Sequence, residues 1–180
     1  GYNFTGDRKS AFQHIILRLM KYGFEYSKSN FIFQNPDDLN FYLELGFLHK
    51  NNFVLIKGAG VDQDDFPFTL PLQKDTFKVL LSARMLFDKG IKEFCEAAKI
   101  LEKKWKYKAK FILCGDIDLH NPAGATEAEL KELLVDDYII WLGHQKNIKN
   151  ILIQSDVVCL PSYREGLPKA LIEAMAIGRP

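Results

Sequence analysis

Two glutamates, Glu165 and Glu173, stand at either end of a turn whose composition suits an anion. The turn follows the apolar run 157–160 and is made of Gly166, Leu167, Pro168 and Lys169. This order is typical of a strand that passes into a helix, with proline at the first helical position, where a missing N–H costs nothing. The free N–H groups of a first helical turn bind anions, and glycine lets a ligand approach the backbone.

The two carboxylates indicate what kind of anion this turn would bind. A bare phosphate offers a carboxylate nothing to bind, whereas a phosphate between a sugar and a ribose offers hydroxyl donors on both sides. The alternative is that Glu165 and Glu173 are ordinary surface acids beside a core helix. The turn alone leaves both interpretations open.

A second group of charged residues follows an earlier apolar run. Residues 79–83 end at Arg84, a short loop carries Lys89, and Gly90 leads into a helix. In open parallel sheets, ligands bind beyond the carboxyl ends of the strands, where both cations would neutralise a diphosphate. Either cation alone is typical of a solvated loop. Together with the glutamates, they predict one shared site.

The alternation of apolar runs with helical stripes predicts the elements that position these groups. The predicted strands cover residues 77–83, 109–114, 138–142 and 157–160, and the predicted helices cover residues 91–105, 126–135, 148–154 and 169–177. Thr126 and Glu129 form a capping box, and Leu101 is expected to face inward with Phe94, Cys95 and Ala98. Strands that alternate with helices predict an α/β fold, a Rossmann-like doubly wound parallel sheet.

The first third of the chain has a shorter version of this pattern. A helical stripe covers residues 12–22, and short strands are expected at 31–33 and 53–57. Between those strands, Asn35 caps a helix that Gly46 ends. The wider segment 12–28 mixes aromatic and aliphatic residues with three cations, Arg18, Lys21 and Lys28. Such a helix either packs in a core or lies on a bilayer surface, and the pattern favours the core.

Composition excludes several classes of function. The chain has 24 Lys and Arg against 23 Asp and Glu, so it carries no large basic field for nucleic acid. Cys95, Cys114 and Cys159 show no Cys-x-x-Cys spacing, which indicates free thiols in a reducing compartment. No apolar stretch approaches the length of about 18 residues that spans a bilayer. These features indicate a cytoplasmic protein.

The motifs together resemble a known family, the family 4 retaining glycosyltransferases of the two-domain type called GT-B. The matching pieces are Gly-Ala-Gly-Val-Asp at 58–62, Ser-Ala-Arg at 82–84, Asp-Lys-Gly at 88–90, Trp-Leu-Gly at 141–143, and Leu-Pro-Ser-Tyr-Arg-Glu-Gly-Leu-Pro-Lys-Ala-Leu-Ile-Glu-Ala-Met-Ala at 160–176. Segments 58–62 and 118–122 resemble the bacterial branch that builds capsule, O-antigen and N-glycan oligosaccharides on a polyprenyl diphosphate carrier.

The resemblance implies a domain organisation. Residues 1–60 are expected to be the C-terminal part of an acceptor-side, Rossmann-like domain, and residues 61–75, which are acidic and contain prolines, the interdomain connector. Residues 76–180 are expected to be the nucleotide-sugar-binding C-terminal domain in truncated form. Because family members are considerably longer, the chain is expected to be an internal fragment that is inactive in isolation.

The resemblance also implies an activity. The expected reaction transfers a sugar from a UDP-N-acetylhexosamine, with retention of anomeric configuration, to a growing cell-surface polysaccharide such as capsule or lipopolysaccharide. A lipid-linked oligosaccharide on polyprenyl diphosphate is an equivalent acceptor. That acceptor would bring the protein to the inner face of the plasma membrane, with peripheral membrane contact as an open alternative.

Roles for individual residues follow from the same resemblance. Arg84 and Lys89 would stabilise the leaving nucleotide diphosphate, and Glu165 would hold sugar hydroxyls. The expected donor-binding residues are Gly115, His144, Gly166, Leu167, Pro168, Lys169 and Glu173, the last of them on the ribose. No cofactor or metal is expected, and the nearest metal-type motif, Asp-Ile-Asp at 116–118, is interpreted as loop chemistry.

Three alternatives remain. The chain as given could bind a nucleotide sugar without turning it over. A second option is another enzyme of the same architecture, such as a nucleotide-sugar epimerase or a phosphorylase, although no cleft histidine or pyridoxal lysine is suggested. A dinucleotide oxidoreductase is weaker still, since no Gly-x-Gly-x-x-Gly follows a strand.

Overall fold

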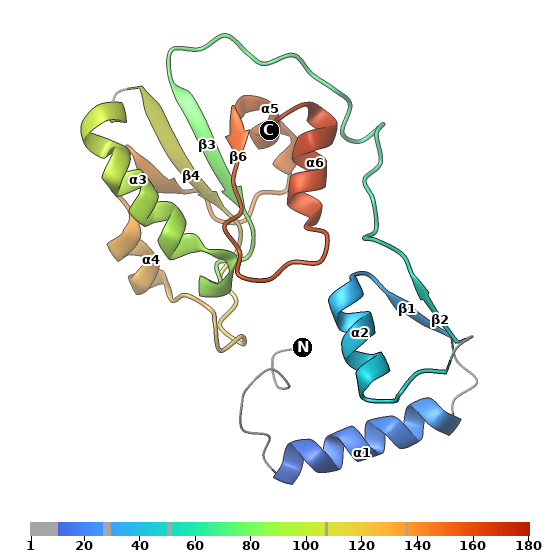
Figure 1. The fold of residues 1–180 in the computed structure, drawn as a ribbon. Coiled ribbons are helices and arrows are strands. Elements are labelled where there is room, and N and C mark those ends of the chain that lie inside the picture. Colours follow the sequence, from blue (N-terminus) through green and yellow to red (C-terminus); the bar gives the residue numbers. More distant parts are fainter. Residues whose placement is uncertain (1–10, 27–29, 50–51, 107, 136) are drawn as a thin grey trace. The chain divides into compact units, whose positions relative to one another are not determined.

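The computed structural model describes residues 11–26, 30–49, 52–106, 108–135 and 137–180. The chain divides into two compact units, residues 1–59 and 60–180 (Figure 1). The predicted roles of residues 1–60 as part of an acceptor-side domain, of residues 61–75 as a connector and of residues 76–180 as a donor-binding domain stay predictions.

The first unit is a small α/β arrangement. Its elements are α1 (Ala11–Tyr26), β1 (Phe31–Phe33), α2 (Pro36–Glu44) and β2 (Phe53–Leu55). The two strands pair in parallel, with Phe31 opposite Phe53. Asn35 caps α2 as predicted, because its side chain accepts a hydrogen bond of 2.7 Å from the Asp38 N–H. Phe24 of α1 anchors that helix by stacking on Phe31, with ring centroids 4.3 Å apart.

The second unit contains a four-stranded parallel sheet in the order β5-β4-β3-β6. Its elements are β3 (Phe77–Ser82), the 3-10 turn η2 (Phe87–Lys89), α3 (Ile91–Trp105), β4 (Ala109–Cys114), α4 (Glu127–Leu133), β5 (Ile139–Trp141), α5 (Ile148–Gln154), β6 (Val157–Val158) and α6 (Lys169–Ile177). Strand β3 lies at the centre, between β4 and β6.

Helices cover both faces of this sheet, and each face has its own apolar core. Leu81 and Leu113 point into a core shared with α3 and α4, whereas Leu80 and Ile112 point into one shared with α5 and α6. Figure 1 shows the helices on the two sides of the strands. The predicted α/β fold with a doubly wound parallel sheet is confirmed.

Several boundaries differ from the sequence prediction for identifiable reasons. Pro168 is the N-cap of α6 rather than its first helical residue, since its ψ of 117° is extended. Leu101 does not face inward, because 41% of it is exposed on the outer side of α3. The 3-10 turn η2 has no periodic pattern and was not predicted. The capping box of Thr126 and Glu129 is present.

Residues in the expected connector are fastened to the second unit. The Thr69 N–H donates to the Ile177 carbonyl at 3.0 Å, and Phe66 packs on the core beneath α5 and α6. Arg179, which is 2% exposed, holds this segment with its guanidinium. Its two terminal nitrogens donate to the carbonyls of Thr69 (2.8 Å) and Ile153 (3.1 Å) and to the Thr69 hydroxyl (3.0 Å).

Replacement of Arg179 by methionine is expected to lower the free energy of unfolding by roughly 3 kcal/mol, because buried carbonyls lose charged donors. Arg179→Lys should recover only part of this loss, since one ammonium cannot reach carbonyls on both sides. Urea unfolding followed by circular dichroism measures both values. The control is Lys103→Met on the exposed side of α3. Equal stability of the Arg179 and Lys103 variants would contradict this account.

Candidate functional site

The site lies where the parallel strands end. Because β3 pairs with both β4 and β6, the segments that follow these three strands leave the sheet at one edge. The register of β3 and β4 continues past the strands, so the Met85 N–H donates to the Asp116 carbonyl at 2.8 Å. Arg84 therefore stands beside the segment 116–118.

Lys89 and Glu165 meet at this edge. The Lys89 Nζ lies 2.6 Å from the Glu165 Oε1, and 24% of each side chain is exposed. Lys89 belongs to η2, after β3, and Glu165 belongs to the loop after β6. The structure thus brings together a cation and a carboxylate that the sequence assigned to one site.

A close backbone contact positions this pair. Gly90 has φ of 76°, and a Cβ there would lie only 2.2 Å from the Pro161 carbonyl oxygen. The Asp88 carbonyl accepts hydrogen bonds of 3.0 Å from both the Ser162 hydroxyl and the Tyr163 N–H. The loop after β6 is therefore fastened to the residues on both sides of Lys89.

Tyr163 adds a side-chain link to α3. Its hydroxyl donates to the Glu93 Oε1 in the first turn of that helix. Two hydrogen bonds hold the pKa of the Glu93 carboxyl below its usual value. The one from the Tyr163 hydroxyl has the larger effect, and the one from the Glu93 N–H has the smaller effect. The Tyr163–Glu93 hydrogen bond also raises the pKa of the Tyr163 phenol, because the carboxylate stabilises its protonated form. Sequence reasoning missed this contact.

Arg84 pairs with Asp118. Its Nη1 lies 2.7 Å from the Asp118 Oδ2, and the Arg84 side chain is 61% exposed. Asp118 belongs to the segment 116–118 that was considered as a metal motif. Among the residues that the structure describes, no group of three His, Cys, Asp or Glu side chains is arranged to hold a metal ion. In the structure, Asp118 is the acidic partner of Arg84.

The α6 end of the site combines an exposed turn with a buried acid. Gly166 and Leu167 are exposed, and the Pro168 carbonyl accepts the first hydrogen bonds of the helix. Glu173 is only 8% exposed and lies 3.4 Å from the Nζ of Lys169, one turn earlier on α6. A buried glutamate is not an ordinary surface acid, so that interpretation is wrong for Glu173.

Gly115 and His144 lie after β4 and β5. Backbone packing requires a glycine at position 115, since a Cβ there would lie 1.7 Å from the Ala83 carbonyl oxygen. Its N–H donates to the Gly143 carbonyl and its carbonyl accepts from the Trp141 Nε1, both at 2.9 Å. His144 follows this junction and is exposed. A ligand contact for Gly115 or His144 stays a prediction.

Comparison with known proteins gives a family and a set of relatives. A family model described as glycosyl transferases group 1 matches residues 62–180. The chain is 33% identical to an N,N'-diacetylbacillosaminyl-diphospho-undecaprenol alpha-1,3-N-acetylgalactosaminyltransferase of Campylobacter jejuni, over 97% of this chain and 46% of the relative. It is 36% identical to a UDP-Gal:alpha-D-GlcNAc-diphosphoundecaprenol alpha-1,3-galactosyltransferase of Escherichia coli, over 62% of this chain and 28% of the relative. The chain thus spans less than half the length of these relatives.

Solved structures share the fold. Anabaena HepE in complex with UDP and glucose matches with a TM-score of 0.70 at 18% identity, over 94% of this chain and 48% of that one. WaaG, a glycosyltransferase involved in lipopolysaccharide biosynthesis, matches with a TM-score of 0.74 at 14% identity, over 95% and 48%. At these identities the likeness concerns the α/β fold with parallel sheets, as in GT-B glycosyltransferases.

The Tyr163–Glu93 hydrogen bond predicts an altered titration. Above the ordinary pKa of a phenol, about 10, Tyr163 should stay protonated in the folded protein, and the hydrogen bond should be lost as pH rises through its elevated pKa. Glu93→Gln should lower the Tyr163 pKa toward the ordinary value, measured by NMR with ring-labelled tyrosine. The control Glu96→Gln, one turn along α3, removes a charge without the hydrogen bond and should lower that pKa less. Equal shifts in the two variants would contradict the contact.

Proposed function

This chain belongs to the glycosyl transferases group 1 family, and on that premise we propose that its second unit binds the donor of a retaining glycosyltransferase. The donor is a nucleotide-diphosphate sugar with UDP as the nucleotide and an N-acetylhexosamine as the sugar. The acceptor is a growing cell-surface saccharide or a polyprenyl-diphosphate-linked oligosaccharide.

The contact between Lys89 and Glu165 carries this proposal. At 2.6 Å, it joins a cation after β3 to a carboxylate after β6, beside the exposed turn that begins α6. A diphosphate needs the cation, and a sugar hydroxyl needs the carboxylate as an acceptor. A nucleotide sugar carries both groups next to each other, so one ligand satisfies both partners of the pair.

Lys89 and Arg84 would serve the leaving group. As the glycosidic bond breaks, negative charge grows on the nucleotide diphosphate, and fixed cations stabilise that charge. The Lys89 side chain is 24% exposed and that of Arg84 is 61% exposed, so Lys89 acts in the less solvated environment. The N–H groups of Gly166, Leu167 and Lys169 would add dipoles to the same oxygens, and Pro168, which has no N–H, would shape the turn in which they lie.

The remaining donor contacts lie on both sides of the diphosphate. Glu165 would accept from sugar hydroxyls once Lys89 turns to the phosphates. Glu173, which is 8% exposed, would accept from the ribose hydroxyls. The backbone around Gly115 and the loop of His144 would contact the base. No metal is required in this scheme, because the cations neutralise the diphosphate.

The identities of donor and acceptor rest on the relatives. The Campylobacter and Escherichia coli proteins are named for transfer to sugars on undecaprenyl diphosphate, and the second is named for a UDP-linked sugar. A lipid-linked acceptor would be met at the inner face of the cytoplasmic membrane by peripheral contact. No described helix is long and apolar enough to cross a membrane.

Lys89→Met is expected to lower kcat by about two to three orders of magnitude, because the diphosphate loses its less solvated cation. Arg84→Met should have a smaller effect, since Arg84 is more exposed. The measurement, made on the full-length enzyme, is transfer from UDP-N-acetylhexosamine to an undecaprenyl-diphosphate saccharide, with the anomeric configuration of the product determined by NMR. Lys103→Met is the matched control on α3. Unchanged turnover in the Lys89 variant would contradict its role.

Glu165→Gln separates the sugar site from the phosphate site. It should reduce turnover without weakening UDP binding, measured by calorimetry, because UDP carries no donor sugar for Glu165 to hold and its phosphates would no longer lie beside that carboxylate. Lys89→Met should weaken UDP binding itself. Calorimetry with UDP, combined with a turnover assay on the unaltered chain, distinguishes the alternatives. UDP binding without transfer supports a binding module, and conversion of the free nucleotide sugar to its epimer supports an epimerase.

Turnover is expected to be insensitive to EDTA, because Arg84 and Lys89 supply the positive charge that a divalent ion would supply. The measurement compares initial rates before and after chelation and after readdition of manganese. Loss of activity in EDTA that manganese restores would show that the reaction needs a metal and would overturn this part of the proposal.

A further inference from the structure

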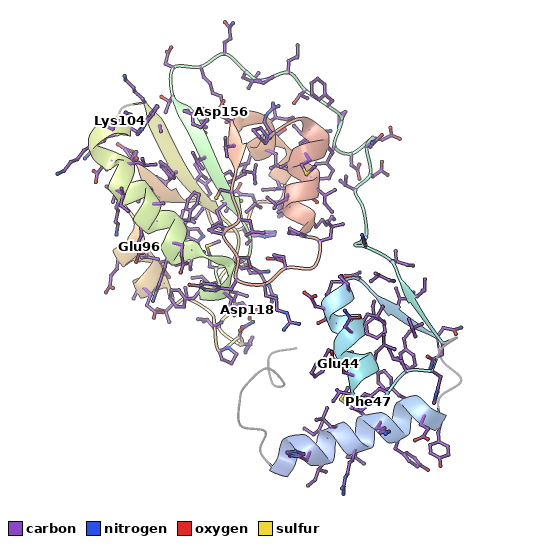
Figure 2. The ribbon with its side chains drawn as sticks, viewed as in Figure 1. Glu44, Phe47, Glu96, Lys104, Asp118 and Asp156 are labelled. Carbon is purple, nitrogen blue, oxygen red and sulfur yellow. The ribbon has the colours of Figure 1, made fainter. Side chains whose placement is uncertain are left out.

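A cavity in the second unit lies on the α5 side of the parallel sheet. Its volume is about 470 Å³, which is within the range of small-molecule pockets. Its lining includes Lys78 and Lys110, near the starts of β3 and β4, whereas the candidate site follows the ends of the strands. Figure 2 shows these two ends of the sheet, with Asp156 beside the start of β3 and Asp118 beyond the end of β4. The lysine end of the cavity is therefore remote from the candidate site.

The floor of this cavity is apolar. Ile112 of β4 and Ile140 of β5 are partners in the sheet register, and Leu142 continues the same face along β5. Ile151 of α5 also lines the cavity. The seven-residue helix α5 does not cover the edge strand β5 completely, since 39% of Leu142 is exposed. An apolar ligand chain placed here would remove these side chains from water.

Two lysines lie side by side at one end of this floor. Lys78 and Lys110 are partners in the register of β3 and β4. Each stands two residues before a member of the core on this face, Leu80 or Ile112, so both lysines point to the same face as the floor. Both are half-buried. Neighbouring strands are about 5 Å apart, and like charges opposite each other destabilise a sheet. A bound anion would remove this repulsion.

No acidic side chain among the described residues pairs with either ammonium group. The Lys78 Nζ donates to the Gln154 Oε1, an uncharged acceptor, at 3.2 Å. In the described part of the chain, the Lys110 ammonium has no hydrogen bond or ion pair. Asp156 binds other groups, because its Oδ2 accepts from the Lys78 backbone N–H at 2.7 Å and lies 2.9 Å from the Lys74 Nζ. The positive charge of the lysine pair is thus available to a ligand.

We propose that this cavity binds a small amphipathic anion, namely a phosphate monoester that carries an apolar chain. The two ammonium groups suit a dianionic phosphate, because each can donate a charge-assisted hydrogen bond to a separate oxygen. Thr76 and Gln154 line the same end and offer uncharged donors. The ligand's chain lies on Ile112, Ile140 and Leu142. Charge complementarity selects an anion, and the apolar floor selects a chain-bearing anion over inorganic phosphate.

This inference goes beyond the proposed function and does not rest on it. The groups that line the cavity are assigned no part in donor binding or transfer, and the two ammonium groups lie at the other end of the strands. The test needs neither sugar donor nor acceptor. A failure of one proposal is therefore distinguishable from a failure of the other.

The experiment is calorimetry of the full-length protein with decyl phosphate, below the concentration at which it forms micelles. The pH is kept above the second pKa of a phosphate monoester, about 6, so that the ligand is dianionic. Decyl phosphate should bind at least about tenfold more tightly than decanol, which lacks the charge, and than inorganic phosphate, which lacks the chain. Equal affinities for decyl phosphate and decanol would overturn the proposal, because the lysines would then play no part.

The lysine pair is tested by substitution. Lys110→Ala should lower the affinity for decyl phosphate by about tenfold or more, since a charge-assisted hydrogen bond is lost. The matched control is Lys103→Ala, which removes the same charge from an exposed position on α3, the helix that covers the other face of the sheet. Lys110→Glu should abolish binding and raise the Tm, because it places an acid opposite Lys78. Binding that Lys110→Glu leaves unchanged would contradict the assignment.

The candidate donor site also contains cations, so its contribution is measured separately. Lys89→Met, and saturation of the unaltered protein with UDP, should each leave the affinity for decyl phosphate unchanged. If either one abolished the binding of decyl phosphate, this ligand would belong to the donor site and the cavity would not be its binding site.

Discussion

The candidate site depends on one close approach, that of Gly90 to the carbonyl oxygen of Pro161. Only glycine permits it, because any Cβ would lie 2.2 Å from that oxygen and the φ of 76° disfavours other residues. The contact places the loop after β6 directly on the turn that carries Lys89, so Glu165 reaches the ammonium. A partly exposed ion pair contributes little stability by itself. The position of this ion pair is therefore determined by backbone packing rather than by the attraction between its two charges.

The parts of the fold that could be predicted have local causes. Asn35 and the Thr126–Glu129 box cap helices through residues three positions apart, and the apolar runs of β3 and β4 are continuous because both faces of the sheet are covered. Features with distant causes could not be predicted. The segment around Thr69 has no regular structure, and it is held by Arg179, which lies 110 residues later in the sequence.

Within the site too, some contacts could be predicted from the sequence and others could not. Lys89 and Glu165 could be assigned to one place because parallel strands end at a common edge, which is a rule of topology. The partners of the other charged groups follow no such rule. Asp118 pairs with Arg84, which lies 34 residues away in the sequence, and Tyr163 pairs with Glu93, which lies 70 residues away. All four side chains lie in loops or in the first turn of a helix, where sequence spacing does not indicate which residues will be in contact. The Asp-Ile-Asp context of Asp118, interpreted from the sequence as loop chemistry, did not indicate its pairing with Arg84.

The pairing of each cation has a consequence for ligand choice. Lys89 and Arg84 are both engaged by carboxylates, at 2.6 and 2.7 Å, so the diphosphate of the proposed donor would have to displace these partners. A free phosphate would take the cations and leave two carboxylates unpaired next to its own negative charge. A nucleotide sugar brings hydroxyl donors with its phosphates, and these can occupy a displaced carboxylate. The exchange is then nearly balanced, because weak, partly exposed pairs are replaced by charge-assisted hydrogen bonds. Under the proposed function, the carboxylates would therefore disfavour simple anions and favour a sugar-bearing donor, a selectivity that the cations alone would not provide.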